Sequence, residues 1–155
     1  DLDRKFDAVV MTGHAFQCLL DPSDRAATLA TIARHLAPGG RFFLDSRNPE
    51  AREWESWTPD ATREVRAHPA FGTVERWNTA DRDAATGIVT YATQYALADG
   101  RRFTAHSKIA FPTQEALADA IAAAGLAVDI WYGDAGGGPL RPDCPDLIPV
   151  GRLAI

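Results

Sequence analysis

The chain opens with two short apolar segments on either side of an amphipathic one. Residues 6–11 and 41–45 are rich in Val and Phe, which is typical of buried strands. Between them, apolar residues recur at helical spacing over residues 22–36, and Pro38-Gly39-Gly40 ends that helix. A strand, a helix and a strand in close succession indicate a parallel crossover unit, whose connection is almost always right-handed. The opening therefore predicts an α/β fold in which the two strands are parallel neighbours.

The middle of the chain changes from helical spacing to alternation of apolar and polar residues. Turn signals such as Thr86-Gly87 and Asp99-Gly100 interrupt the alternation. Four strands are predicted, at residues 63–68, 73–79, 88–97 and 102–111. Such a meander forms an antiparallel sheet, and we interpret residues 60–111 as an inserted lid over the ends of the first two strands.

The last third of the chain predicts one more helix and two more strands. Thr113 caps a helix whose apolar stripe stops at Gly125. Residues 126–133 and 147–153 are predicted strands, and the connection between them is rich in Gly and Pro. Pro149 falls inside the last strand, where it cannot donate a ladder hydrogen bond, so we expect a local bulge or a shortened strand.

Composition and charge narrow the classes of partner. A chain of 155 residues, 46% hydrophobic and 24% charged, is long enough for one soluble domain with a real core. Its net charge of −5 and scattered arginines argue against a nucleic-acid-binding face, because neutralising phosphates requires clustered cations. Cys18 and Cys144 have neither metal-site nor disulfide-framework spacing, and no apolar run is long enough to span a membrane. We expect a cytoplasmic protein with a small-molecule partner, and without a metal, a nucleic acid or a membrane.

Three stretches resemble the class I S-adenosylmethionine-dependent methyltransferases. Residues 6–16 look like the fourth strand of that family and the loop after it, with Thr12-Gly13-His14 in the loop. Residues 35–45, with their Pro-Gly-Gly turn, resemble the helix end and the fifth strand, and residues 111–134 resemble the last helix and terminal strands. The resemblance implies a Rossmann-like methyltransferase fold, strands 4 to 7 of the family sheet, with an inserted antiparallel lid. It also implies transfer of a methyl group from S-adenosylmethionine to a small-molecule N or O nucleophile.

The resemblance places the cofactor beyond the carboxyl ends of the strands, where ligands of open α/β sheets bind. The cofactor-binding residues that follow from it are Met11, Thr12, Gly13 and Phe16. Gly13 permits close backbone approach or a positive φ angle, or it is only a turn residue. Phe16 presents its ring to the adenine or the cationic sulfonium, or it belongs to the core.

The candidate catalytic residue is His14, the titratable group of this loop. It orients the acceptor or accepts a proton from it, although methyl transfer depends more on alignment than on acid–base help. A structural hydrogen bond is the alternative role. Arg47 and Asn48 leave the second strand at the same end of the sheet and are the candidate substrate-binding residues, suited to a carboxylate or an amide. A solvated loop fixed by Pro49 is the alternative there.

The chain departs from the family at its beginning, where the first strand, the glycine-rich loop and the ribose-binding acidic residue are missing. We interpret it as a single methyltransferase-like domain with its α/β core at residues 1–48 and 112–155, and we expect S-adenosylmethionine to bind weakly or not at all. The family flanks its fourth strand with the first and fifth, so one edge of residues 6–11 is expected to be free and to promote a homo-oligomer. The alternative function is a non-catalytic ligand-binding or self-associating domain.

Overall fold

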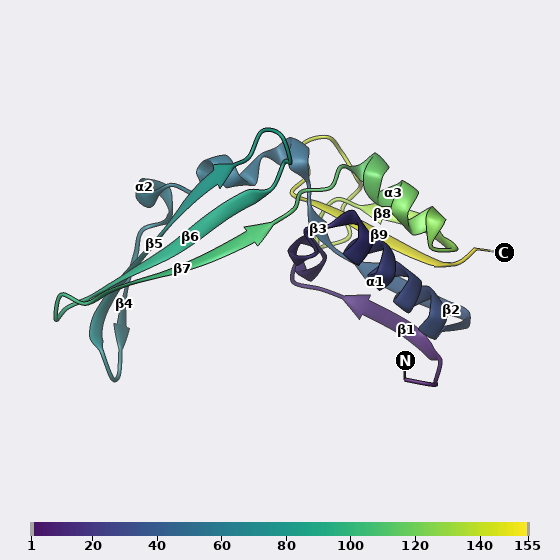
Figure 1. The fold of residues 1–155 in the computed structure, drawn as a ribbon, viewed down its shortest axis with the longest axis horizontal. Coiled ribbons are helices and arrows are strands. Elements are labelled where there is room, and N and C mark those ends of the chain that lie inside the picture. Colours follow the sequence, from purple (N-terminus) through teal and green to yellow (C-terminus); the bar gives the residue numbers. More distant parts are fainter. Residues whose placement is uncertain (1, 155) are drawn as a thin grey trace. The chain divides into compact units, whose positions relative to one another are not determined.

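A computed structural model describes residues 2–154, which form two compact units (Figure 1). The first unit comprises the chain up to Ala51 and from Ala110 onward, and the second comprises residues 52–109. None of the helices within residues 2–154 has the length and apolar character that a membrane crossing requires.

The first unit is a five-stranded sheet with two α-helices. The strands follow the order β1–β2–β9–β8, and the short β3, which follows β2 after one residue, also pairs with β9. The elements are β1 (Phe6–Met11), the 3₁₀ helix η1 (Ala15–Cys18), α1 (Pro22–His35), β2 (Leu36–Leu44), β3 (Ser46–Arg47), the 3₁₀ helix η2 (Pro49–Ala51), α3 (Gln114–Ala123), β8 (Leu126–Tyr132) and β9 (Asp146–Leu153).

The predicted crossover unit is confirmed. β1 and β2 are parallel neighbours joined through α1, with Val9 opposite Phe42. The second strand begins earlier than predicted, because Leu36 already pairs with Phe6 and the Pro-Gly-Gly turn lies inside β2. Gly39 adopts a φ of 79°, which glycine tolerates without a steric penalty, and the β1–β2 register shifts at this turn.

The last strand accommodates its proline at an irregular point of the sheet. The pairing of β9 with β2 ends at Val150 and its pairing with β3 begins at Leu147, so Pro149 lies in the gap between them. On the other side of β9, the register with β8 shifts between Val128 and Ile130. The missing N–H of the proline therefore costs little, since the ladder is already interrupted here.

Both helices pack on one face of the sheet and against each other (Figure 1). α1 begins with Pro22. The first N–H groups of a helix have no acceptor within the helix, so the missing N–H of proline costs nothing at this position. α3 is capped as predicted by Thr113, whose hydroxyl accepts a hydrogen bond from the Ala116 N–H at 3.2 Å. The buried core, to which the helices and the sheet both contribute, consists of Phe16, Leu29, Ile32, Leu36, Phe42, Leu44, Leu117, Ile121, Leu126 and Leu147.

The opposite face of the sheet carries an apolar row. The register aligns Val10, Phe43, Val150 and Ile130 across four strands. Val10 is 66% exposed and Ile130 is 45% exposed. Among the described residues β1 forms one edge of this sheet, so the exposed Val10 end of the apolar row lies on an edge strand.

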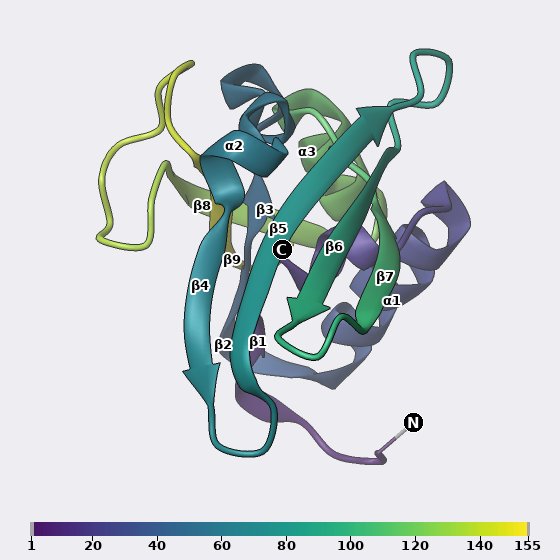
Figure 2. The ribbon, with the colours of Figure 1, turned by 90° about the vertical axis from the view of Figure 1, so that its left-hand side faces the viewer.

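The second unit is a four-stranded antiparallel sheet, as the alternation predicted. Its order is β4–β5–β6–β7, and each strand pairs with the next along the chain (Figure 2). The elements are the 3₁₀ helix η3 (Glu53–Ser56), α2 (Pro59–Thr62), β4 (Glu64–His68), β5 (Gly72–Arg82), β6 (Val89–Leu97) and β7 (Arg102–Ile109).

Asp83 organises the turn between β5 and β6. Its carboxylate accepts hydrogen bonds from the N–H groups of Thr86 at 3.1 Å and Ala85 at 2.8 Å. These bonds, the one from Thr86 foremost, lower the pKa of Asp83 because they favour the charged form. The Asp83 carboxylate therefore stabilises the turn, as expected of an aspartate in a turn signal.

Candidate functional site

The loop after β1 is held by one carboxylate at the end of β2. The N–H groups of Gly13 and His14 donate to the two oxygens of Asp45, at 3.1 and 2.7 Å. The Asp45 N–H in turn donates to the carbonyl oxygen of Met11 at 3.2 Å. Gly13 and His14 adopt φ angles of 72° and 57°, and a left-handed non-glycine residue is uncommon. The loop thus has a fixed, unusual backbone at the carboxyl end of the sheet, where open α/β sheets bind ligands.

The His14 side chain reaches the first residue of β9. Its Nε2 lies 2.9 Å from Asp146 Oδ1, and the two side chains are 27% and 17% exposed. An ionised carboxylate only accepts hydrogen bonds, so Nε2 carries the proton and Nδ1 keeps a lone pair while the ring is neutral. The pair therefore presents an oriented imidazole that a ligand can still reach.

Asp146 is held by backbone hydrogen bonds and is paired in the sheet with Arg47. Its N–H donates to the Gly133 carbonyl oxygen at 3.0 Å, and its own carbonyl oxygen accepts from Cys144 Sγ at 3.0 Å. Across the β3–β9 pairing it stands opposite Arg47. This end of the sheet consequently gathers an imidazole, two carboxylates and a guanidinium.

The predicted cofactor residues divide into two groups. Thr12 and Gly13 are exposed and Met11 is half-buried, all at the end of β1. An added Cβ at Gly13 would meet no atom within 4 Å, so the space beside this backbone is open. Phe16, in η1, has no exposed surface and packs in the hydrophobic core.

The two predicted substrate residues have protein partners. The backbone N–H and Nη1 of half-buried Arg47 both donate to Gln17 Oε1, at 3.3 and 3.0 Å. Asn48 is 3% exposed, and its Nδ2 donates to the carbonyl oxygens of Pro142 and Cys144 at 3.0 and 2.9 Å. Asn48 thereby fixes the connection between β8 and β9.

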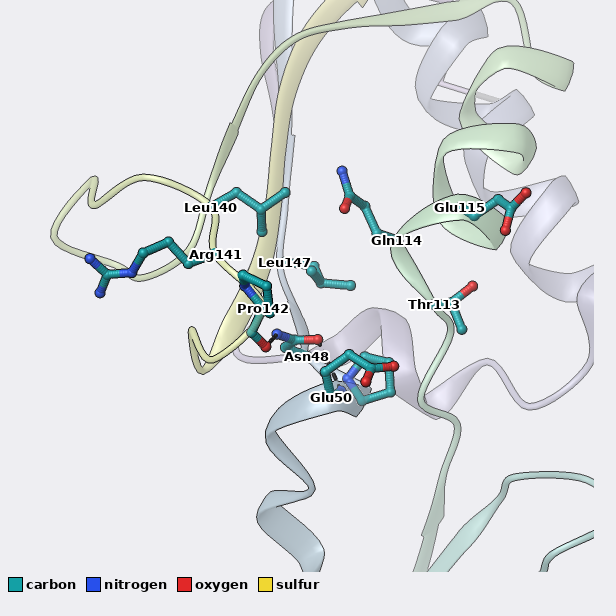
Figure 3. A pocket seen from close by; sticks show the side chains of 10 residues that line it. Asn48, Glu50, Thr113, Gln114, Glu115, Leu140, Arg141, Pro142 and Leu147 are labelled. Atoms are coloured by element: carbon teal, nitrogen blue, oxygen red, sulfur yellow. Dashed lines mark hydrogen bonds between the residues drawn. The ribbon is translucent and has the colours of Figure 1, made fainter.

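A cavity of about 450 Å³ opens beside Asn48, within the size range of small-molecule pockets. It lies between the connection after β3, the start of α3 and the connection before β9. Figure 3 shows the Gln114 side chain reaching from α3 toward Leu140 and Leu147 on the other side. Glu50 is among the residues that line the cavity. Leu147, which lines the cavity, directly follows Asp146 in β9, but Asp146 and His14 are not among the lining residues.

Sequence reasoning missed Asp45, Asp146 and Gln17. Asp45 directly follows a parallel strand, so the rule that ligands bind at carboxyl ends could have selected it. Asp146 begins an antiparallel strand, whose first residue lies at that same end of the sheet, but 132 positions separate it from His14. No local spacing signals a contact over that distance.

Comparison with known sequences gives a partial match. No protein-family model matches the chain. A stretch of 47 residues is 43% identical to the cypemycin N-terminal methyltransferase of a Streptomyces species, and it covers 30% of this chain and 19% of that protein.

Comparison with solved structures identifies the fold. The CcbJ methyltransferase of Streptomyces caelestis matches with a TM-score of 0.82 at 14% identity, over 100% of this chain and 60% of its own. DesVI of Streptomyces venezuelae matches with a TM-score of 0.71 at 24% identity, over 99% and 61%. CalS10 of Micromonospora echinaspora, an amino pentose methyltransferase, matches with a TM-score of 0.70 at 23% identity, over 98% and 60%. The chain therefore has the class I S-adenosylmethionine-dependent methyltransferase fold and spans about 60% of the length of these structures.

Proposed function

We propose that the chain forms part of an S-adenosylmethionine-dependent methyltransferase that modifies the nitrogen of a small amine. The observation that carries the proposal is the His14–Asp146 pair at the carboxyl end of β1, in a chain with the methyltransferase fold. A protonated amine must lose its proton before its nitrogen can attack a methyl group, and Nδ1 of His14 can take that proton. Alignment of the reactants supplies most of the remaining rate.

The names of two structural neighbours favour nitrogen over oxygen as the acceptor atom. KedS8 of a Streptoalloteichus species is a sugar N-methyltransferase, with a TM-score of 0.67 at 24% identity. MtfA is a glycopeptide N-methyltransferase, with a TM-score of 0.56 at 19% identity. A hydroxyl acceptor is the second candidate, because the same imidazole can accept its proton.

The cofactor is proposed to contact Met11, Thr12 and Gly13. When bound, S-adenosylmethionine supplies the methyl group on a cationic sulfur. The open space at Gly13 allows close approach of a ligand to the backbone. Asp45 and Asp146 bring two carboxylates to this end of the sheet against the one guanidinium of Arg47, and the excess negative charge favours both the sulfonium and an ammonium acceptor.

The acceptor's body is proposed to lie in the cavity beside Asn48 and Leu147. Leu140 and Leu147 offer apolar contacts for a carbon skeleton, and Gln114 offers an amide for hydroxyl groups. Glu50 adds a negative charge that suits a cationic amine.

An NMR titration with S-adenosylhomocysteine tests the cofactor site. We expect the amide signals of Thr12, Gly13 and His14 to shift, since these lie on the proposed contact surface. Because the chain covers only 60% of the CcbJ structure, we expect a dissociation constant in the millimolar range, about 4 kcal/mol of binding free energy. NADH, which shares the adenosine but has no sulfur, is the control ligand. Absence of shifts in this loop, or the same shifts with NADH, would contradict the proposal.

We further expect the chain to self-associate through β1 and the apolar row beside it. Val10→Lys places a charge on this surface and should weaken the association about tenfold or more, which corresponds to about 1.4 kcal/mol. Val65→Lys is the matched control, because Val65 is 64% exposed against 66% for Val10 but lies on β4 in the second unit. Analytical ultracentrifugation measures the effect. A monomeric wild-type chain, or equal effects of the two variants, would show that β1 is not the interface.

A further inference from the structure

Gln17 lies fully buried behind the candidate loop and links three segments. Its Nε2 donates to the Ala110 carbonyl oxygen at 2.8 Å, and its Oε1 accepts the two hydrogen bonds from Arg47. Its backbone N–H donates to the His14 carbonyl oxygen at 3.0 Å, and its carbonyl oxygen accepts from the Ala110 N–H at 2.8 Å. A buried amide destabilises a fold unless its polar atoms are paired, and here both side-chain atoms are.

The three segments have distinct places in the chain. His14 belongs to the loop proposed to face the cofactor and the acceptor. Arg47 lies shortly before residue 52, where the chain passes into the second unit, and Ala110 is the first residue after its return. Gln17 therefore joins the candidate loop to both connections that lead to the inserted sheet.

We propose that Gln17 is a positioning residue whose buried side chain couples the candidate loop to both connections of the inserted sheet. The proposal rests on the proposed function in one respect, namely that the cofactor binds at this loop. Any loop movement that displaces Gln17 must either break its bonds to Ala110 and Arg47 or carry these residues along. A ligand that favours one loop conformation consequently changes the stability of both connections.

Two substitutions separate the two links. Gln17→Met keeps the length of the side chain but removes both the donor and the strong acceptor, so it breaks the side-chain links to Ala110 and Arg47. Gln17→Glu keeps an acceptor for Arg47 but has no N–H for the Ala110 carbonyl oxygen, so it breaks one link. Gln94→Met is the matched control, because Gln94 is a half-buried glutamine whose Nε2 donates to Thr79 Oγ1 at 3.3 Å in the second unit.

Hydrogen exchange of single amides, followed by NMR, gives the first result. In the free chain we expect the Ala110 amide to exchange about tenfold faster in both Gln17 variants, an opening free energy lower by about 1.4 kcal/mol. The Arg47 amide should exchange faster in Gln17→Met only. Amides of α3 and β8, and all of these amides in Gln94→Met, should keep their wild-type rates.

The response to millimolar S-adenosylhomocysteine gives the second result. In the wild-type chain and in Gln94→Met, the amide signals of Ala110 and Arg47 should shift together with those of the loop. In Gln17→Met the shifts should stay within the loop, because the links are missing. A residue that only fills the core would leave this transmitted response in place.

The proposal is wrong if exchange at Ala110 and Arg47 is unchanged in the Gln17 variants, or if the ligand response still reaches both residues in Gln17→Met. Loss of structure in both variants, seen as fast exchange throughout α3, would assign Gln17 a purely structural role and overturn the proposal too. A wild-type loop that does not respond to the ligand contradicts the proposed function instead. Exchange in the free variants then still decides whether Gln17 holds the two connections.

Discussion

Replacing Gly151 with alanine is expected to lower the free energy of unfolding by about 3 kcal/mol, the upper part of the usual range for an overfilled core. Gly151 is buried in β9 between Phe42 of β2 and Val128 of β8. An added Cβ would overlap the carbonyl oxygen of Ala127 and lie 2.6 Å from Phe42 Cε1. The carbonyl belongs to the backbone of the adjacent strand, so the strands must separate to admit the methyl group. Urea unfolding followed by far-UV circular dichroism measures the loss.

Gly136→Ala is the matched control for this substitution. Gly136 is exposed, and its added Cβ would approach a single atom, the side-chain Oδ1 of Asp134, at 3.0 Å. We expect a change of about 0.5 kcal/mol or less, as for an ordinary surface position. A Gly151→Ala chain as stable as the wild type would show that β2, β9 and β8 can part at little cost. Equal losses in the two variants would show that the effect belongs to glycine replacement in general.

Elements set by local patterns were predictable from the sequence, whereas boundaries set by pairing were not. The helical spacing before residue 36 and the alternation after residue 63 depend on near neighbours, and both predictions are confirmed. Local pattern alone makes Pro38-Gly39-Gly40 a break between helix and strand. The strand nevertheless starts at Leu36, because pairing with Phe6 across the sheet decides where β2 begins.

The sequence predicts those residues of the candidate site that directly follow a strand, but not the partners that the fold brings to them from distant parts of the chain. The end of β1 follows from the rule on carboxyl ends, so the loop around Gly13 and His14 was found. For Phe16 the sequence permits either a ligand contact or a core position, and only the structure shows that its side chain is buried in the core. The partners of His14 and Gln17 were missed, because Asp146 and Ala110 lie 132 and 93 positions away and a single sequence carries no signal for such contacts.

His14→Asn is expected to slow methyl transfer to an amine about 100-fold, the low end of the range for acid–base catalysis, since alignment supplies much of the rate. The amide cannot accept the proton that a protonated amine must lose. The rate is measured by mass spectrometry of the methylated amine, with S-adenosylmethionine at millimolar concentration so that weak cofactor binding does not limit the comparison.

The partner substitution Asp146→Asn should have a similar effect for a different reason. The introduced amide can donate to Nε2 of His14, which moves the ring proton to Nδ1 and leaves that nitrogen unable to accept another. If His14 and Asp146 act as a unit, either single substitution already removes their shared contribution to the rate. The double variant should therefore be no slower than either single variant. Effects that multiply in the double variant would show that the two residues act separately.

The pH dependence distinguishes proton acceptance from a merely structural role of His14. As the pH rises toward about 10, where a lysine-like amine titrates by itself, solvent removes the proton and the base becomes unnecessary. The defect of His14→Asn should therefore shrink as the pH rises, with the wild-type and variant rates converging at the alkaline end. A defect of constant size across the pH range would mean that the substitution disturbs the backbone held by Asp45 instead, and that His14 does not take the proton.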